Sequence, residues 1–249
     1  MSLSREQMLQ EMGIGPIWRL RDAPAAEPVS DLAVAEPVAE APAARPAMPA
    51  VVGEGWAGLE QEIAACRACA LCEQRKQAVP GVGDREADWL FIGEGPGAEE
   101  DAKGEPFVGQ AGKLLDAMLA AIDLKRGDNV YIANAVKCRP PGNRTPEAAE
   151  MEACWPYLKR QIAMLKPKLI VLLGRAALQA VMKEERSLGN SRGKLFEYRD
   201  GELVIPIIAT YHPAYLLRNL PDKAKAWEDL CFARATMLER QAQGRDLPF

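Results

Sequence analysis

The sequence has little histidine, few aromatic residues and no long hydrophobic run. One histidine occurs in 249 residues, and aromatic residues make up 6%. No stretch approaches the roughly 18 apolar residues that cross a membrane, and the charged first 22 residues lack the apolar segment of a secretory signal. We therefore expect a cytoplasmic protein with no membrane partner. In that reducing compartment its six cysteines are expected to be metal ligands or core thiols, not disulfides.

The surplus of basic residues that many nucleic-acid-binding domains carry is also missing. The net charge is −4, from 31 Lys and Arg against 35 Asp and Glu. The imbalance lies in residues 1–60, with 4 basic and 9 acidic residues, whereas the remainder holds 27 and 26. A nearly neutral domain can still bind DNA through a local basic face. Net charge therefore neither supports nor excludes a nucleic-acid partner.

Composition divides the chain into four parts. Residues 1–22 include an apolar segment at 8–20, which is either a docking peptide for a protein partner or a helix that packs back. Residues 23–52 consist largely of Ala and Pro with no aromatic residue, so a disordered linker is expected. A globular domain is expected at 53–242 and a tail at 243–249. Nothing in these features demands more than a monomer.

Apolar periodicity within the domain predicts alternating strands and helices. Buried parallel strands are expected at residues 89–93, 130–135, 169–174 and 204–210. Helices are expected at about 56–69, 111–123, 145–165, 174–183 and 222–242. Cys231 in the last of these is interpreted as a core thiol. This alternation predicts an α/β fold whose parallel sheet is covered on both faces, with ligands beyond the carboxyl ends of the strands.

A glycine-rich stretch follows the first strand. Residues 93–98 fit a loose form of the dinucleotide-binding motif. However, Pro96 removes a backbone N–H where a pyrophosphate needs one, and the acidic residues 99–101 would repel phosphates. A dinucleotide enzyme is therefore the weaker alternative.

Two polar residues follow other strands. Asn134 ends the second strand, and its amide could read the edge of a nucleobase or simply cap a turn. His212, the only histidine, follows the fourth strand on a turn stiffened by Pro213, which favours a functional role. Leu216 and Leu217 come next. Such apolar side chains either wedge into a base stack or begin a helix that packs on the core.

Four of the cysteines form two separated pairs. Cys66 and Cys69 are three residues apart, and Cys138 and Cys154 lie far downstream. This spacing fits a zinc site and an iron–sulfur cluster about equally well. Cys72 complicates the ligand set, because it falls near the same helix face as the first pair.

Several long motifs together resemble one known family. They are Gly93–Gly97 with the following acidic run, Gly104–Gly109 with Ala111 and Gly112, Val130–Pro141, and His212–Arg218. With the cysteine pattern, they make residues 66 to about 230 closely similar to the family 4 uracil-DNA glycosylases, the iron–sulfur group of the uracil-DNA glycosylase superfamily. The resemblance implies a three-layer α/β/α sandwich with a central four-stranded parallel sheet. It also implies a [4Fe–4S] cluster held by Cys66, Cys69, Cys138 and Cys154, which leaves Cys72 as an extra thiol.

The implied activity is hydrolysis of the bond between uracil and its sugar, in single- or double-stranded DNA. By resemblance, Phe107 stacks on the flipped uracil, Asn134 reads its edge, and Glu100 crowds C5 to exclude thymine. His212 donates a hydrogen bond to the departing uracil anion.

The remaining implied roles concern water and DNA. Gly95 in the substrate site replaces an Asp that positions water in other superfamily members, so Glu94 is expected to orient water or stabilise the sugar cation. Leu216 or Leu217 fills the gap in the DNA, and Arg218 grips phosphate. The basic loop containing Arg192 is either a further phosphate contact or a solvated turn.

Two other classes of protein remain as alternatives. A non-catalytic sensor of uracil or abasic sites would need the base pocket but no donor to the leaving group, so His212 argues against it. The other is a zinc or dinucleotide enzyme, and the brown colour of an iron–sulfur protein would exclude the zinc version.

Overall fold

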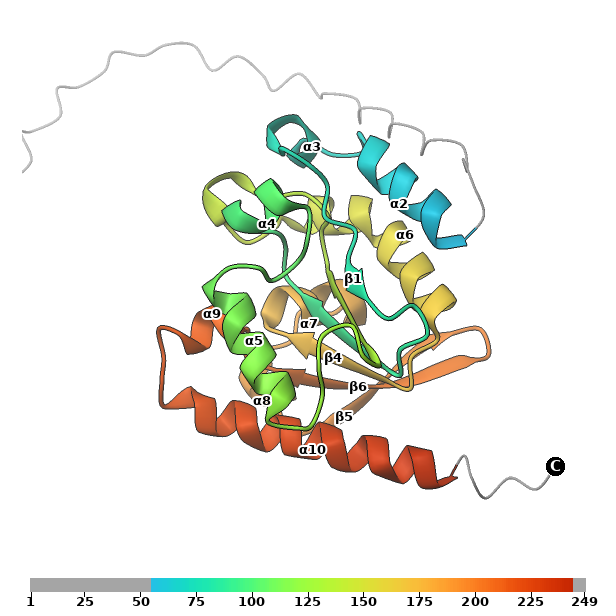
Figure 1. The fold of residues 1–249 in the computed structure, drawn as a ribbon, viewed down its shortest axis with the longest axis vertical. Helices are drawn as coiled ribbons and strands as arrows, with labels where there is room; N and C mark the ends of the chain where they lie inside the picture. Colours follow the sequence, from blue (N-terminus) through green and yellow to red (C-terminus); the bar gives the residue numbers. More distant parts are fainter. Residues whose placement is uncertain (1–54, 244–249) are drawn as a thin grey trace, which may run out of the picture. The chain divides into compact units, whose positions relative to one another are not determined.

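The computed structural model describes residues 55–243 (Figure 1). The docking segment expected at 1–22 and the linker expected at 23–52 lie outside the described residues. So does the expected tail, apart from Gln243, which ends the last helix. No helix in the described part of the chain is long and apolar enough to span a membrane.

A six-stranded sheet lies at the centre of the domain, in the order β1-β3-β2-β4-β6-β5. The strands are β1 (Val82–Gly83), β2 (Trp89–Gly93), β3 (Val130–Asn134), β4 (Leu169–Leu173), β5 (Leu195–Asp200) and β6 (Leu203–Thr210). The four inner strands β3, β2, β4 and β6 run parallel, which confirms the predicted parallel sheet. Strands β1 and β5 add an antiparallel edge on either side. Apolar runs did not reveal these two strands, because β1 is very short and β5 is largely exposed.

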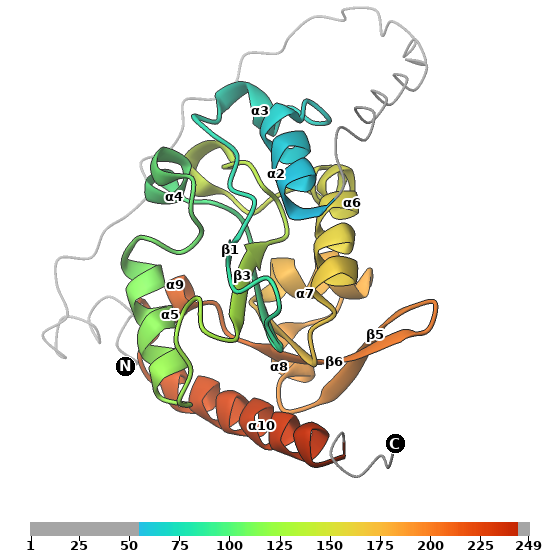
Figure 2. The same ribbon diagram turned by 45° about the vertical axis from the view of Figure 1, so that its right-hand side comes forward.

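Helices cover the sheet on both faces (Figures 1 and 2). They are α2 (Gly55–Ala65), α3 (Leu71–Gln74), α4 (Ala98–Lys103), α5 (Gln110–Ala120), α6 (Ala148–Leu165), α7 (Arg175–Met182), α8 (Leu188–Ser191), α9 (Pro213–Leu216) and α10 (Asp222–Gln243), with a 3-10 turn η1 (Pro141–Asn143). Each long helix overlaps one of the predicted ranges. The short ones were not predicted, since three to six residues are too few to show a helical period.

Alternate residues of each inner strand point to opposite faces of the sheet. In β2, Trp89 and Phe91 belong to the apolar cluster under α5 and α10. Leu90 and Ile92 belong to the cluster under α6 and α7. The sheet is therefore the middle layer of an α/β/α sandwich, as expected.

The first predicted helix ends earlier than expected, at Ala65 rather than at residue 69. The carbonyl of Ala64, which would accept from Ala68 in a longer helix, instead accepts from Nη2 of Arg75 at 2.6 Å. The N–H of Ala68 donates to Sγ of Cys66 at 3.4 Å. The cysteines at 66 and 69 thus lie in a turn between α2 and α3, not on one helix face.

Candidate active site

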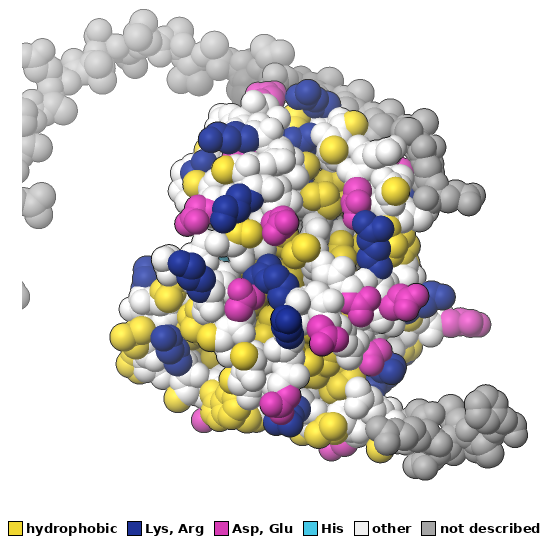
Figure 3. All heavy atoms as spheres, in the orientation of Figure 1, with side chains coloured by type: hydrophobic (Ala, Val, Ile, Leu, Met, Phe, Trp, Pro, Cys, Tyr) yellow, Lys and Arg dark blue, Asp and Glu magenta, His cyan; other side chains and the backbone are white. Residues whose placement is uncertain are grey.

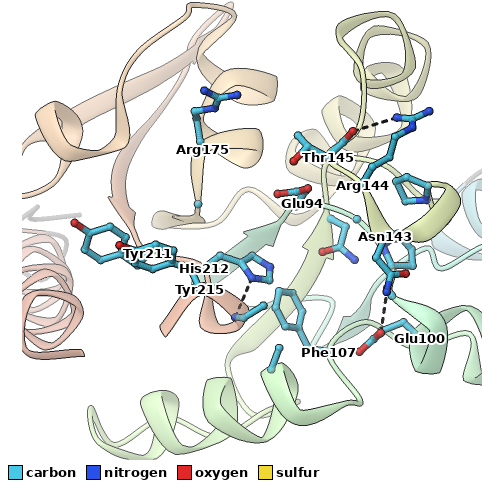
Figure 4. A pocket seen from close by; sticks show the side chains of 18 of the residues that line it. Glu94, Glu100, Phe107, Asn143, Arg144, Thr145, Arg175, Tyr211, His212 and Tyr215 are labelled. Atoms are coloured by element: carbon cyan, nitrogen blue, oxygen red, sulfur yellow. Dashed lines mark hydrogen bonds between the residues drawn. The ribbon is translucent and has the colours of Figure 1, made fainter. Parts of the chain in front are cut away.

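A cavity of about 580 Å³ opens at the carboxyl ends of the parallel strands. Its wall includes the residues that directly follow β2, β4 and β6, and the last residue of β3. Figure 4 shows Glu94, Phe107 and His212 pointing into the same space. This is the position at which open α/β sheets bind ligands.

Asn134 lies on the floor of this cavity and is 2% exposed. Its side-chain oxygen Oδ1 is buried and has no hydrogen-bond partner among the described residues. A Cβ on Gly93 would stand 2.5 Å from this oxygen and 2.5 Å from the Phe107 ring, so the neighbouring strand must carry glycine there. Buried polar atoms are almost always paired in native proteins. The amide of Asn134 is therefore suited to a ligand, rather than to capping a turn.

Phe107 stacks against His212, with ring centroids 5.4 Å apart and an angle of 29° between the rings. Its backbone has a φ of 55°, which is unusual for an aromatic residue. Arg126 holds this conformation, since its guanidinium donates to the carbonyl oxygens of Pro106 at 2.9 Å and Phe107 at 2.8 Å. A Cβ on Gly112 would lie 1.8 Å from the same Phe107 oxygen, which explains this glycine.

His212 is the N-cap of α9, and its Nδ1 accepts from the N–H of Ala214 at 3.1 Å. A neutral imidazole that accepts at Nδ1 carries its proton on Nε2. Burial lowers the pKa of His212 to about 4. The positive charge of Arg218 adds to this shift, and the negative charge of Glu100 opposes it. The residue is therefore a neutral hydrogen-bond donor at physiological pH.

Glu94 lines the cavity beside Gly95. Burial raises the pKa of Glu94, and a hydrogen bond from Thr145 and the positive charge of Arg175 partly offset this. A Cβ on Gly95 would stand 2.8 Å from Cγ2 of Val136, so packing against the segment after β3 already requires glycine at this position.

Glu100 also lines the cavity, but its carboxylate is occupied by backbone groups. It accepts from the N–H of Gly97 at 3.1 Å, of Val108 at 2.9 Å and of Gly109 at 3.1 Å. The residue thus joins the start of α4 to the segment that carries Phe107. It also takes up the amide of Gly97, which in a dinucleotide-binding loop would face phosphate.

The structure separates the two leucines that follow His212. Leu216 is 1% exposed and belongs to the core, whereas Leu217 is 42% exposed. Arg218 is exposed and lines the cavity. Leu217 and Arg218 are therefore both exposed, and Leu216 packs on the core, which was the alternative considered for it.

Arg192 is engaged within the fold. Its Nε donates to Asp229 at 2.7 Å, its Nη2 donates to the carbonyl of Lys225, and its side chain is 13% exposed. Its guanidinium carbon also lies 4.7 Å from the centre of the Tyr211 ring. This is unlike the exposed loop expected of a phosphate contact. On the face drawn in Figure 3, Lys and Arg side chains alternate with Asp and Glu side chains instead of forming one basic patch.

Sequence reasoning did not identify several residues of the cavity wall, among them Thr145, Arg175, Tyr211 and Tyr215. Arg175 could have been found, because it directly follows the third predicted strand, at the same edge of the sheet as Asn134 and His212. The tyrosines lie close to His212 in sequence, and Tyr215 is part of the His212–Arg218 motif, but no role was assigned to either.

A second, smaller hollow lies between α2, α6 and the segment after β3. Among the residues that line it are the four expected ligands and Cys72, namely Cys66, Cys69, Cys72, Cys138 and Cys154. Four of these thiols are buried and Cys69 is half-buried, whereas Cys231 is exposed, contrary to the expected core position. In the part of the chain that the structure describes, no three His, Cys, Asp or Glu side chains have the geometry of a single metal-ion site.

Hydrogen-bond donors point at two sulfur atoms of this hollow, which we call the thiol cavity after the five cysteines that line it. Nη1 of Arg75 donates to Sγ of Cys138 at 2.9 Å, and the backbone N–H of Lys137 donates to Sγ of Cys154 at 3.3 Å. Burial raises the pKa of the Cys138 thiol to about 11 and that of Cys154 to about 12. Donors of this kind favour sulfur that carries negative charge, as thiolate does when it binds iron or zinc. The donor set fits a thiolate-ligated group.

Comparison with known proteins agrees with this geometry. The family model of the uracil DNA glycosylase superfamily matches residues 80–231. A type-4 uracil-DNA glycosylase of Archaeoglobus fulgidus is 47% identical over 161 residues, which cover 63% of this chain and 80% of the relative. The type-4 enzyme of Pyrobaculum aerophilum is 42% identical over 186 residues (73% and 94%), and that of Thermotoga maritima is 44% identical over 162 residues (65% and 82%). The chain therefore belongs to the uracil DNA glycosylase superfamily and, within it, to the type-4 group.

Proposed function

We propose that this protein is a uracil-DNA glycosylase, which hydrolyses the N-glycosidic bond of uracil in single- or double-stranded DNA and leaves an abasic site for base-excision repair. Its membership in the type-4 group supports this function. The observation that carries it is the buried Oδ1 of Asn134, which has no hydrogen-bond partner in the described part of the chain and lies in one cavity with the ring of Phe107 and a neutral His212.

Base recognition follows from the amide of Asn134. Uracil offers a donor at N3–H and an acceptor at O4, so Oδ1 of Asn134 accepts from N3 while Nδ2 donates to O4. Cytosine presents the opposite pattern and would leave both buried groups unpaired. Phe107 supplies a stacking face, which is worth about 1–3 kcal/mol for a base. The target must first leave the DNA stack, and a mismatch or a single strand makes this easier.

Cleavage of the bond between C1′ and N1 leaves its electron pair on uracil and a positive charge on the sugar. Nε2–H of His212 donates to O2, where the negative charge develops. Because this imidazole is neutral, it stabilises the anion as an oriented donor and needs no proton from solvent. Removal of one such donor typically lowers a rate by about 10²–10³-fold.

Water completes the reaction by adding hydroxide to C1′, and its proton goes to the uracil anion. Glu94 is the carboxyl group that can orient this water or stabilise the cationic sugar from the cavity wall. We infer that Glu100 helps to exclude the methyl group of thymine, because its hydrogen bonds to the N–H groups of Gly97 and Val108 fix the backbone that lines the cavity. Leu217 would fill the gap left by the flipped base, and Arg218 would contact a phosphate.

The thiol cavity supports the second part of the proposal. Cys66, Cys69, Cys138 and Cys154 would hold a [4Fe–4S] cluster, with Cys72 as an additional neighbouring thiol. When bound, the cluster supplies cross-links between the turn after α2, the segment after β3, and α6. Arg75 and the N–H of Lys137 stabilise the thiolates that it requires. Such thiols stay free in a reducing compartment, which is why we also propose a cytoplasmic location.

The test of this function uses the purified protein and labelled oligonucleotides that carry a single uracil, thymine or cytosine. Hot alkali after incubation cleaves the strand at any abasic site. We expect cleavage at uracil alone, and its loss in His212→Ala and Asn134→Ala. Lys168→Met, which changes an exposed residue paired with Asp88, serves as the control and should retain activity. Tight binding of uracil-containing DNA without cleavage by the native protein would contradict the proposal.

A further inference from the structure

The cavity contains two pairs of stacked aromatic side chains. Phe107 and His212 form one pair, which the proposed function uses for uracil. Tyr211 and Tyr215 form the other, with ring centroids 5.0 Å apart and an angle of only 17° between the rings. In Figure 4 the tyrosine rings lie on one side of the His212 imidazole and the Phe107 ring on the other. The second pair is therefore not part of the uracil-binding stack.

Contacts with α10 and with Arg192 fix the two tyrosine rings. Oη of Tyr215 donates to Asp222 at 2.6 Å. The guanidinium of Arg192 lies over the ring of Tyr211 and is itself held by Asp229. Both rings are half-buried and rest on the core cluster under α10, yet both line the cavity. A planar ligand would thus meet rings that are already in place.

The cavity has room for more than one base. Its volume of about 580 Å³ is within the range that encloses drug-sized molecules, and a single pyrimidine is smaller than these. Arg218 lines it close enough to His212 for its charge to affect the imidazole, so a phosphate beside the tyrosines would have a cation nearby. Aromatic rings next to a cation are the pattern by which proteins hold unpaired nucleotides.

We propose that Tyr211 and Tyr215 form a second base-binding subsite, which stacks an unpaired nucleobase adjacent to the flipped uracil in the same strand. The inference rests on the proposed function and extends it from one nucleotide to two. In a duplex the neighbouring base is held by its own partner and must be released, whereas in a single strand it is free. The subsite therefore favours single-stranded over fully paired substrate.

The test is a cycle between protein and DNA variants. Single-stranded oligonucleotides carry uracil with its 5′ or its 3′ neighbour either intact or replaced by a base-less tetrahydrofuran residue, and kcat/KM is measured for each. The kcat/KM of the native protein should fall about 30-fold when one of the two neighbours lacks its base, the middle of the range for stacking on one aromatic residue. Tyr215→Leu should have a lower kcat/KM than native protein on the intact strand, and removal of the neighbouring base should lower it no further. Tyr215→Phe keeps the ring and should respond as the native protein does.

The controls separate failure of the subsite from failure of the function. Release of uracil by native protein from the intact strand establishes the glycosylase independently of the subsite. The subsite is wrong if native protein is indifferent to both neighbouring bases. It is also wrong if Tyr215→Leu keeps the native response, which is the result expected if the rings only cover the core. Should Tyr215→Leu fail to fold, as judged by thermal melting, Tyr211→Leu takes its place in the same cycle.

Discussion

Nζ of Lys137 lies 2.8 Å from the backbone carbonyl oxygen of Asn134 and donates a hydrogen bond to it. The lysine is 1% exposed, and its other partner is the neutral Oε1 of Gln161 at 2.6 Å. Its own backbone N–H donates to Sγ of Cys154. One residue thus connects the end of β3, which carries the base-reading amide, with the wall of the thiol cavity.

Replacement of Lys137 by Met should affect both sites together. The change removes a buried positive charge beside the proposed cluster and frees the carbonyl of Asn134. We expect iron retention and uracil excision each to fall by about 10- to 100-fold, as is usual when a residue that supports metal ligands is lost. Iron content, visible absorption and kcat/KM measure the two effects. Normal iron content with normal activity would show that the link has no role.

Replacement of Asn134 by Ala should separate activity from stability. Removal of two hydrogen bonds to uracil predicts a fall in kcat/KM of about 100-fold or more. The same change removes a buried oxygen that has no hydrogen-bond partner within residues 55–243, so the melting temperature should stay constant or rise. Thermal melting and the excision assay, carried out on the same variant, test whether activity falls while stability is kept. A large drop in melting temperature would mean that the amide has a structural role instead.

The pKa of His212 predicts how stability depends on pH. The ordinary value of 6.5 applies to the unfolded chain and about 4 to the folded one, so between these values the unfolded state binds more protons. This histidine therefore lowers stability progressively as pH falls from 6.5 to about 4, and contributes no change above 6.5. In His212→Gln this part of the pH dependence should disappear. Melting temperatures of both proteins at several pH values measure the difference, and parallel curves would contradict it.

Arg126 should act on catalysis through Phe107. Its two hydrogen bonds to the carbonyl oxygens at Pro106 and Phe107 help to offset the strain of a left-handed φ, which is of order 1–3 kcal/mol. Arg126→Ala should therefore lower kcat/KM by about tenfold or more, mainly through KM. Asp116→Asn is the matched control, because it weakens the ion pair of Arg126 but keeps both carbonyl contacts. Equal effects of the two variants would refute this role.

The two leucines after His212 should have different effects. Leu216→Ala empties a fully buried core position and should cost about 2–5 kcal/mol of unfolding free energy. Leu217→Ala changes an exposed side chain, so its stability should be nearly native, while excision from duplex DNA falls and excision from single strands is kept. Denaturant unfolding and paired excision assays distinguish the outcomes. If Leu217→Ala excises uracil from duplex DNA as fast as native protein does, Leu217 has no role in the proposed mechanism.

Much of this protein could be predicted from local sequence. The inner strands and long helices follow from apolar periodicity, which depends on near neighbours in the chain. Asn134 and His212 could be singled out because each ends or follows a strand at the edge where parallel sheets bind ligands. The cysteines could be grouped by spacing, although Cys72, which lines the same hollow, could not be ranked against the others.

Other features depend on contacts between distant residues, and only the tertiary structure decided them. Arg192 reads as an exposed basic residue in the sequence, yet the fold places it against Asp229 on α10. Leu216 and Leu217 are chemically identical, and the direction of a short helix buries one and exposes the other. Glu100, predicted to crowd C5 of uracil, lines the cavity, and the fold also engages its carboxylate with the backbone N–H groups of Gly97 and Val108. The sequence alone thus determined the type of chemistry and its place in the sheet. Which side chains are free to perform that chemistry was decided by packing, since a partner far along the chain can take up a group that appears available in the sequence.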